Sequence, residues 1–238
     1  MAAPIYDAHA RAWVEVDLAA LVHNARWLAA RARVPLLPMV KADAYGLGAV
    51  PVAHALLGAS GLHIAALGVA AVAEGEELRA AGIAHPIVCF SPLVGTDLAR
   101  ARAARIEPSF GHPHEIAAWA HTNAPWHLSI DTGMSRAGAS ARELLHDAAA
   151  LRALRDACAA APPASTFTHF HSADESAASI AEQEARFAEV VGALALPDQV
   201  ARHCDNSAGI IVRDGSPWAF VRPGVALYGV TQQLDAPL

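Results

Sequence analysis

Eight short apolar segments alternate with longer alanine-rich segments along the 238 residues of this chain. Each apolar segment has the length of a buried strand, and the segments between them carry apolar residues at helical spacing. The expected strands are residues 36–41, 63–69, 86–90, 107–110, 126–131, 166–172, 201–206 and 219–224. Strands that alternate with helices form parallel sheets through βαβ units, and eight such units in a chain of this length predict a TIM (β/α)8 barrel. An open doubly wound sheet is the alternative, but no GxGxxG turn follows the first strand.

A further strand and helix precede the expected barrel. Residues 13–17, WVEVD, have the alternation of a strand. Asp17 then suits the N-cap of a helix over residues 18–32, whose apolar side chains fall on one face. A second amphipathic helix is expected over residues 180–194. We found no internal repeat or linker, so we expect one domain over residues 1–238.

Composition excludes several classes of partner. Hydrophobic residues make up 54 % of the chain and charged residues 17 %, with a formal net charge of −6 and no run of like charges. This balance favours a globular domain and argues against nucleic acid or an anionic membrane surface as partner. The apolar runs are shorter than the roughly 20 residues of a membrane span. Three widely spaced cysteines and no visible secretory signal favour a reducing, cytoplasmic location.

The first barrel strand ends in MVKADAYGLG. In a TIM barrel the active site lies at the carboxyl ends of the strands, so Lys41 would stand at the mouth of the barrel. A lysine is costly to bury in its charged form, whereas a neutral lysine is the nucleophile that forms a Schiff base with an aldehyde. A side chain that reaches out to solvent is the alternative. Tyr45, Gly46 and Gly48 follow in a loop that suits close approach of a phosphate.

The fifth and sixth strands also end in polar residues. In WHLSIDTGMSRAG, Ser129 and Asp131 share a face and lead to Arg136, which could simply pair with Asp131. In TFTHFHSADE, His169 and His171 point to the same side. A His-x-His pair can bind a metal, but no third ligand has convincing spacing, so we expect no metal site.

The last two strands provide candidates for an anion site. In RHCDNSAG, Asn206 and Ser207 lead into a turn that could start a helix, and Cys204 has the character of a small buried residue. In AFVRPGVALYG, Arg222 interrupts an apolar strand and needs an acceptor. The loops after strands seven and eight of TIM barrels often bind phosphate.

Taken in order, these segments resemble the alanine racemase family of fold-type III pyridoxal-phosphate enzymes. MVKADAYGLG is similar to the cofactor-lysine signature of that family, and this motif is specific. HLSIDTGMSRAG, THFHSADE, HCDNSAG and VRPGVALYG are similar to its later segments. The resemblance extends from Trp13 to Gly229 and implies interconversion of L- and D-alanine with pyridoxal 5′-phosphate as cofactor.

The resemblance also implies a role for each matching residue. Lys41 would hold the cofactor as a Schiff base and act as one of two catalytic bases. Arg222 would donate to the pyridine nitrogen, supported by His203 from behind, and Arg136 would approach the phenolic oxygen. The other residues expected at or beside the cofactor are Tyr45, His169, Asn206, Ser207, Gly224 and Val225, of which Tyr45, Ser207 and the backbone of Gly224 and Val225 would bind the phosphate.

An arginine at the pyridine nitrogen has a chemical consequence. Arginine stays charged and cannot accept a proton, so the nitrogen remains neutral. A neutral ring is a weaker electron sink than a protonated one. Such a site favours brief removal and return of the proton at Cα over decarboxylation or transamination.

The chain departs from the family pattern in two respects. Ser129 stands where many members have a lysine that becomes carbamylated and positions the arginine matching Arg136, so Arg136 needs another partner, such as a bound anion. The family continues with a β-rich domain that supplies the second base, a tyrosine, and a clamp for the substrate carboxylate, whereas this sequence ends at TQQLDAPL. We therefore expect slow racemisation by this chain and a homodimer in the full-length form. A barrel that only binds the cofactor, or a racemase of another small amino acid such as serine, are the alternatives.

Overall fold

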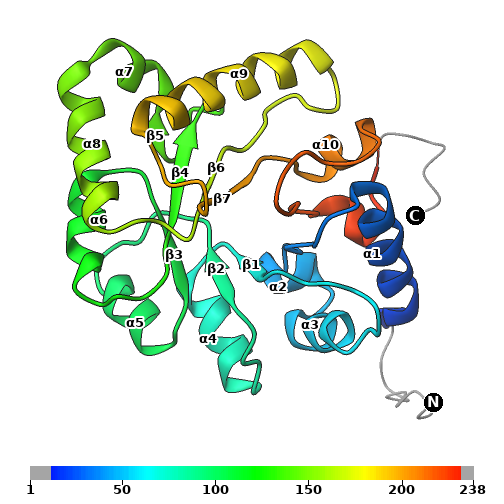
Figure 1. The fold of residues 1–238 in the computed structure, drawn as a ribbon. Helices are drawn as coiled ribbons and strands as arrows, with labels where there is room; N and C mark the ends of the chain where they lie inside the picture. The colour runs from blue at the N-terminus through cyan, green and yellow to red at the C-terminus, as the bar shows by residue number, and fades with distance from the viewer. Residues whose placement is uncertain (1–11, 232–238) are drawn as a thin grey trace.

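A ring of parallel strands forms the centre of the molecule (Figure 1). The computed structural model describes residues 12–231. Six strands pair in the order β1-β2-β3-β4-β6-β7, all parallel, and the short strand β5 pairs with β4 beside this path. The strands are β1 (Leu67–Val69), β2 (Ile87–Cys89), β3 (Glu107–Phe110), β4 (His127–Asp131), β5 (Ala139–Ser140), β6 (Ser165–Phe167) and β7 (Ala201–His203).

Residues 36–40 and 219–223 close the ring between β7 and β1. Leu36 forms parallel bridges with both Ile64 and Val221, so one residue joins the first and last parts of the barrel. Arg222, in the second of these segments, forms a parallel bridge with Asn206, which follows β7. The predicted TIM-barrel fold is therefore confirmed. The first segment pairs only at isolated residues because prolines at positions 35 and 38 cannot donate to a ladder.

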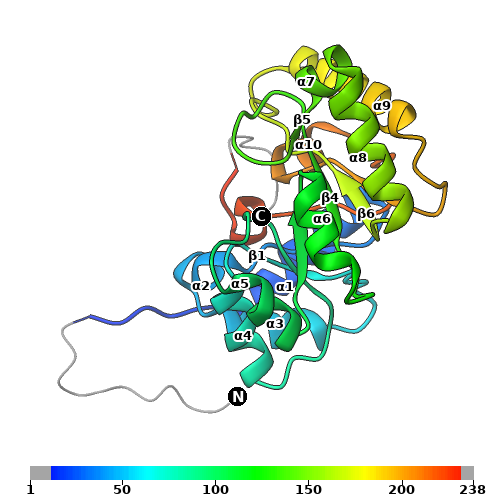
Figure 2. The same ribbon diagram turned by 90° about the vertical axis from the view of Figure 1, so that its left-hand side faces the viewer.

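The helices cover the outside of the ring (Figures 1 and 2). They are α1 (Leu18–Ala32), α2 (Lys41–Gly46), α3 (Ala49–Leu57), α4 (Val72–Ala80), α5 (Asp97–Ala103), α6 (Pro113–Ala120), α7 (Ala141–His146), α8 (Ala148–Ala160), α9 (Ala177–Leu194), α10 (Ser207–Val212) and the 3-10 helix η1 (Val225–Tyr228). The two helices predicted individually are confirmed as α1 and α9. Within the described range, no helix has the length and apolar character needed to cross a membrane.

Local chemistry accounts for the position of α1. The Asp17 carboxylate accepts hydrogen bonds from the backbone N–H groups of Ala19 and Ala20 at 2.8 and 3.0 Å, which caps the helix at the predicted residue. Leu21, Ala25 and Leu28 follow at helical spacing and are buried. This stripe holds α1 against the barrel.

The predicted strand over residues 13–17 is wrong: these residues form no strand in the described part of the chain. Trp13 and Val14 are exposed, and the segment leads away from the barrel in Figure 2. A strand needs backbone partners on a neighbouring strand, and no strand within residues 12–231 pairs with this segment.

Several predicted strands are longer than the observed ones, and β1 begins only at Leu67 instead of residue 63. β6 ends at Phe167 and β7 ends at His203, whereas the apolar patterns continue to residues 172 and 206. Beyond these points the chain leaves the sheet, and residues 169, 170, 206 and 207 line a pocket instead. β6 and β7 therefore end where the residues that form the wall of the pocket begin.

Candidate active site

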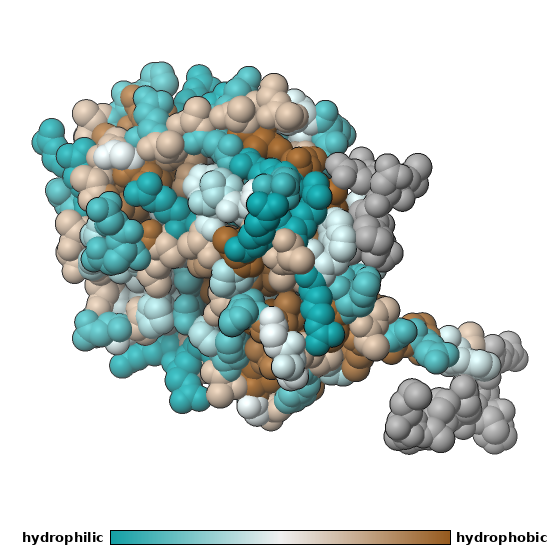
Figure 3. Space-filling model, turned by 45° about the vertical axis from the view of Figure 1, so that its right-hand side comes forward, coloured by the Kyte–Doolittle hydropathy of each residue, from teal (hydrophilic) through white to brown (hydrophobic). Residues whose placement is uncertain are grey.

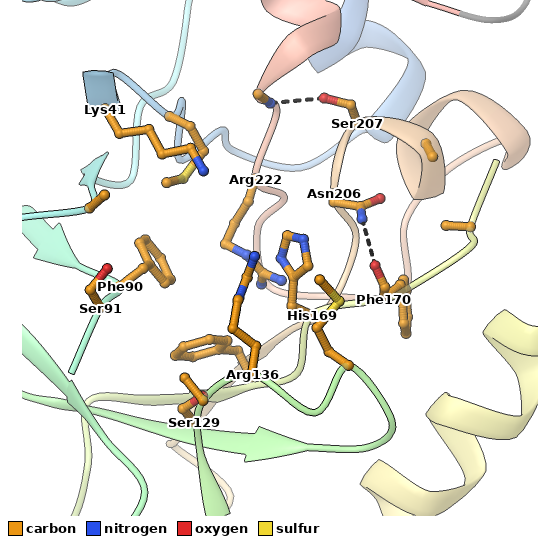
Figure 4. Close-up of a pocket in the computed structure, with 18 of the residues that line it drawn as sticks. Lys41, Phe90, Ser91, Ser129, Arg136, His169, Phe170, Asn206, Ser207 and Arg222 are labelled. Carbon is orange, nitrogen blue, oxygen red and sulfur yellow. Dashed lines mark hydrogen bonds between the residues drawn. The ribbon is translucent and has the colours of Figure 1, made fainter. Parts of the chain in front are cut away.

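A cavity of about 440 Å³ opens at the carboxyl ends of the barrel strands (Figure 4). This is the end at which TIM barrels carry their active sites, and the volume is in the usual range for a small-molecule site. The structure brings nearly all the residues singled out from the sequence to its wall, namely Lys41, Tyr45, Arg136, His169, Asn206, Ser207, Arg222, Gly224 and Val225. His203 lies behind this wall and is fully buried.

Lys41 is the only lysine in the chain. It follows the first barrel segment, and its side chain extends into the cavity (Figure 4). The Nζ atom lies 5.9 Å from the centroid of the Tyr45 ring. The N-terminal amine is thus the one other primary amine that could react with an aldehyde, which makes covalent attachment simple to map.

The backbone after Lys41, labelled α2, is a left-handed turn and not a right-handed helix. Residues 42–45 have φ angles of 51°, 53°, 52° and 57°, a conformation that costs roughly 1–2 kcal/mol per residue outside glycine. Glu74 accepts a hydrogen bond from the backbone N–H of Ala42 at 2.7 Å, and Asp43 accepts one from Ala49 at 2.6 Å. These carboxylates hold the strained turn, which places Tyr45 beside Lys41. Glu74 was not predicted from the sequence, because nothing in its local pattern distinguishes it from other glutamates of α4.

Hydroxyl and backbone donors from three loops meet on one side of the cavity. Ser207 Oγ accepts hydrogen bonds from the backbone N–H groups of Gly224 and Ala226 at 2.9 and 3.2 Å. A Cβ atom at Gly224 would lie 2.7 Å from the Tyr45 hydroxyl oxygen, so glycine is required for this close approach. Burial raises the pKa of Tyr45, and its hydroxyl therefore keeps the proton that it can donate. Two hydroxyls and neighbouring N–H groups suit an anion such as phosphate.

Arg222 is a buried cation that bonds to no carboxylate in the described part of the chain. Its Nη1 donates to Nδ1 of His203 at 2.5 Å and to the carbonyl of the same residue at 2.8 Å. Its Nη2 donates to the carbonyls of Thr168 and Cys204 at 2.6 and 3.0 Å. Burial lowers the pKa of Arg222 to about 10, so it remains charged at neutral pH. Within residues 12–231 the Nε–H group has no hydrogen-bond acceptor, which leaves one donor of this cavity-lining side chain for a ligand.

Two aromatic rings flank the Arg222 guanidinium. Its Cζ atom lies 5.1 Å from the centroid of the Phe167 ring and 5.9 Å from that of Phe90. Aromatic faces attract a guanidinium and restrict its movement. Neither ring was predicted from the sequence, because phenylalanine at the end of an apolar strand gives no signal beyond core packing.

Positive charge dominates the centre of the cavity. Burial lowers the pKa of His169 to about 3, and the nearby charges of Arg222, Arg136 and Lys41 act in the same direction. His169 is therefore neutral among three cations. In Figure 4 the side chain of Arg136 points toward His169 and Arg222. Such a cavity favours a ligand that carries negative charge.

Asp131 does not neutralise Arg136. One carboxylate oxygen accepts the backbone N–H groups of Gly133 and Ser135 at 2.9 and 3.0 Å, and the other accepts the backbone N–H of Arg136 at 3.0 Å. The carboxylate thus shapes the loop, and no ion pair forms with the Arg136 side chain within residues 12–231. Ser129 lines the cavity on the same strand, below Asp131.

The remaining residues singled out from the sequence have structural roles or lie outside the cavity wall. Asn206 caps α10 by accepting from Gly209 at 3.1 Å and donates to the carbonyl of Phe170 at 3.1 Å. Burial raises the pKa of Cys204 strongly, so its thiol is not a nucleophile. His171 lies near Ser172 and outside the cavity wall. No group of three or more potential metal ligands occurs in the described residues.

Comparisons with known proteins agree with this arrangement. The pattern of the alanine racemase N-terminal domain matches residues 16–232. Alanine racemases of Syntrophobacter fumaroxidans and Thermobifida fusca are 34 % and 37 % identical over 95 % and 93 % of this chain, which covers 61 % and 62 % of their lengths. The chain therefore spans about three fifths of these relatives.

Solved structures give the same result. An alanine racemase from Bacillus anthracis with bound L-Ala-P superposes with a TM-score of 0.82 at 27 % identity, over 98 % of this chain and 60 % of that one. An alanine racemase from Streptomyces coelicolor gives 0.79 at 32 % identity, over 91 % of this chain and 59 % of that one. On this evidence the chain belongs to the alanine racemase N-terminal domain family.

Proposed function

We propose that this domain binds pyridoxal 5′-phosphate through Lys41 and takes part in the interconversion of L- and D-alanine. The observation that carries the proposal is the position of the single lysine in a cation-rich cavity whose wall also contains Ser207, Gly224 and Arg222. Membership of the alanine racemase family supports alanine as the substrate.

The residues present fit this cofactor. The Tyr45 and Ser207 hydroxyls, with backbone N–H groups of Gly224 and Val225, would bind the phosphate, and the Gly224 N–H would then exchange its present hydrogen bond to Ser207 Oγ for one to the phosphate. The missing Cβ at Gly224 leaves room for the Tyr45 hydroxyl at this place. The Nε–H of Arg222 would donate to the pyridine nitrogen. When bound, the cofactor supplies a reactive aldehyde and a conjugated ring that delocalises negative charge from Cα.

Each nearby side chain then has a definite task. Arg222 stays protonated and cannot take up another proton, so it binds the pyridine nitrogen without protonating it. His169 is neutral, so it can lie against the ring without repelling the three cations around it. Lys41, whose side chain lies in the same cavity, would be the base that removes a proton from Cα of the substrate or returns one.

We further propose that the full-length protein is a cytoplasmic homodimer. Exposed valines at positions 212, 225 and 230 lie on α10 and around η1, next to the mouth of the cavity. Figure 3 shows hydrophobic patches between hydrophilic side chains on the face turned to the viewer. An apolar surface beside an active site suits a subunit or domain contact. The three cysteines are all buried and form no disulfide, as suits a reducing compartment.

The proposal is tested by incubating the purified chain with the cofactor and L-alanine, or D-alanine, in deuterated water. Chiral chromatography should show each enantiomer converting to the other, with deuterium at Cα of the product, and Lys41→Ala should abolish conversion. Cofactor binding without any conversion would contradict racemisation and favour a barrel that only binds the cofactor. Faster conversion of L-serine than of L-alanine would show that serine, and not alanine, is the preferred substrate.

A further inference from the structure

A continuous chain of side-chain hydrogen bonds crosses the barrel interior below Arg222. Glu107 lies 2.9 Å from Nε2 of His127. Nδ1 of His127 lies 2.6 Å from the hydroxyl of Ser165, which lies 2.9 Å from Nε2 of His203. Nδ1 of His203 then accepts from Arg222 at 2.5 Å. Glu107, His127 and Ser165 each begin a strand, so the chain runs from the amino-terminal end of the barrel to the wall of the cavity.

With both histidine rings neutral, the two ends of this chain allow a single direction for its hydrogen bonds. An arginine can only donate, so Nδ1 of His203 must be unprotonated and its Nε2 carries the hydrogen. Ser165 accepts that hydrogen and donates its own to Nδ1 of His127. His127 then donates from Nε2 to the carboxylate of Glu107, which can only accept. Every bond therefore points from Arg222 toward Glu107.

The chain is shielded from water. His203 is fully buried, and His127, Ser165 and Arg222 are at most 5 % exposed. The His203 ring packs between Phe167 and Phe220, at centroid distances of 5.0 and 4.2 Å. Burial strengthens such bonds, and aligned bonds polarise one another. The partly buried carboxylate of Glu107, with a side chain 19 % exposed, is the one charged end besides Arg222.

We propose that Glu107 is a positioning residue which, through His127 and Ser165, fixes the ring of His203 and thereby holds Arg222 in place at the cavity wall. The bond between His203 and Arg222 belongs to the site already described, whereas the three residues behind it do not. The effect on catalysis rests on the proposed function, in which Arg222 meets the pyridine nitrogen. The direction of the hydrogen bonds, by contrast, does not depend on any ligand being bound to the protein.

The first test is nitrogen-15 NMR of the ligand-free chain, labelled at histidine, with His127 and His203 assigned by single substitution. Both rings should carry the proton on Nε2 and none on Nδ1. Glu107→Gln keeps an oxygen acceptor and should leave both rings unchanged. Glu107→Lys offers only donors and should move the His127 proton to Nδ1. The matched control is Asp97→Lys, which reverses the charge at a carboxylate of similar exposure that pairs with Arg100. This substitution should change the protonation of neither histidine ring.

The second test uses Ser165→Ala to break the chain at its middle. Glu107→Lys should weaken binding of pyridoxal phosphate by about threefold to tenfold, as expected for the loss of one hydrogen bond. In the Ser165→Ala background the same substitution should change binding by less than about twofold. A through-space effect of charge, or general destabilisation, would survive the loss of one hydroxyl.

The outcomes separate this inference from the proposed function. If either wild-type ring carries its proton on Nδ1, or if Glu107→Lys has the same effect on binding with and without Ser165, Glu107 does not position Arg222. If the rings behave as described but Arg222→Lys leaves binding of pyridoxal phosphate unchanged, the proposed role of Arg222 fails while the directed chain stands.

Discussion

Gly224 shows how a single absent atom shapes the site. A Cβ at this position would lie 2.7 Å from the Tyr45 hydroxyl oxygen, which is closer than such atoms can approach. Gly224→Ala should therefore displace Tyr45 and weaken binding of pyridoxal phosphate by about tenfold or more, the effect of losing one hydrogen bond to a charged group. A titration followed by cofactor absorbance measures this change.

Gly192→Ala is the matched control for this prediction. Gly192 lies on α9, and a Cβ atom at this position would have no neighbour within 4 Å, so its substitution should leave cofactor affinity unchanged. Equal affinities for Gly224→Ala and Gly192→Ala would show that the Tyr45 hydroxyl does not bind the phosphate.

His169 predicts how stability depends on pH. Its pKa is about 3 in the folded chain against 6.5 for the free side chain, so the unfolded chain binds a proton that the folded chain does not. The resulting stability is complete above pH 6.5 and is lost as the pH falls toward 3. His169→Gln should therefore reduce the slope of unfolding free energy against pH, between pH 6 and 4, by at most about 1.4 kcal/mol per unit. Urea titrations at several pH values measure it, and identical slopes would mean that His169 is protonated in the fold.

At the residue scale, the sequence predicts site residues well where a charged side chain interrupts an apolar strand near its carboxyl end. Lys41 and Arg222 are of this kind, and both line the cavity. Of the hydrogen-bonded chain behind Arg222 only His203 was predicted, because Glu107 and Ser165 stand at the starts of strands far apart in sequence. Only the register of the closed barrel brings them together with His127.

Among the structural elements, the left-handed turn after Lys41 has the most unusual backbone geometry. Its four residues have positive φ angles, yet none of them is glycine. Ala42→Gly should relieve part of the strain and stabilise the chain by up to about 1 kcal/mol. Ala30→Gly, at an exposed site inside α1, should instead destabilise it by about 1 kcal/mol. Thermal or urea unfolding of the two variants measures the contrast, and destabilisation of equal size in both would mean that the turn is not strained.

Strand prediction worked where hydrophobic burial alone determines the strand. β3 has the predicted limits, and β2 and β4 lie within them, because both faces of these strands are covered. The segment over residues 13–17 alternates apolar and charged residues as a strand can, but it has no neighbouring strand in the described range. The short strand β5 was not predicted, because two residues are too few to show a period.

For the whole molecule, the closed ring explains why residues from both ends of the chain form one site. Leu36 joins segments that begin and end the barrel, and this junction brings Lys41 and Arg222 to the wall of the same cavity. Alternation of strands and helices was sufficient to predict this closure. The strain after Lys41 and the directed hydrogen bonds below Arg222 arise only from three-dimensional packing.

The central claim, that Lys41 is the residue that binds the cofactor, is tested most directly by chemical trapping. The chain is loaded with pyridoxal phosphate, reduced with borohydride to convert the carbon–nitrogen double bond to a stable amine, digested and mapped by mass spectrometry. Because Lys41 is the only lysine, the pyridoxyl group should be found on it in stoichiometric amount and should be absent in Lys41→Arg. A label confined to the N-terminal amine, or no label at all, would contradict the claim.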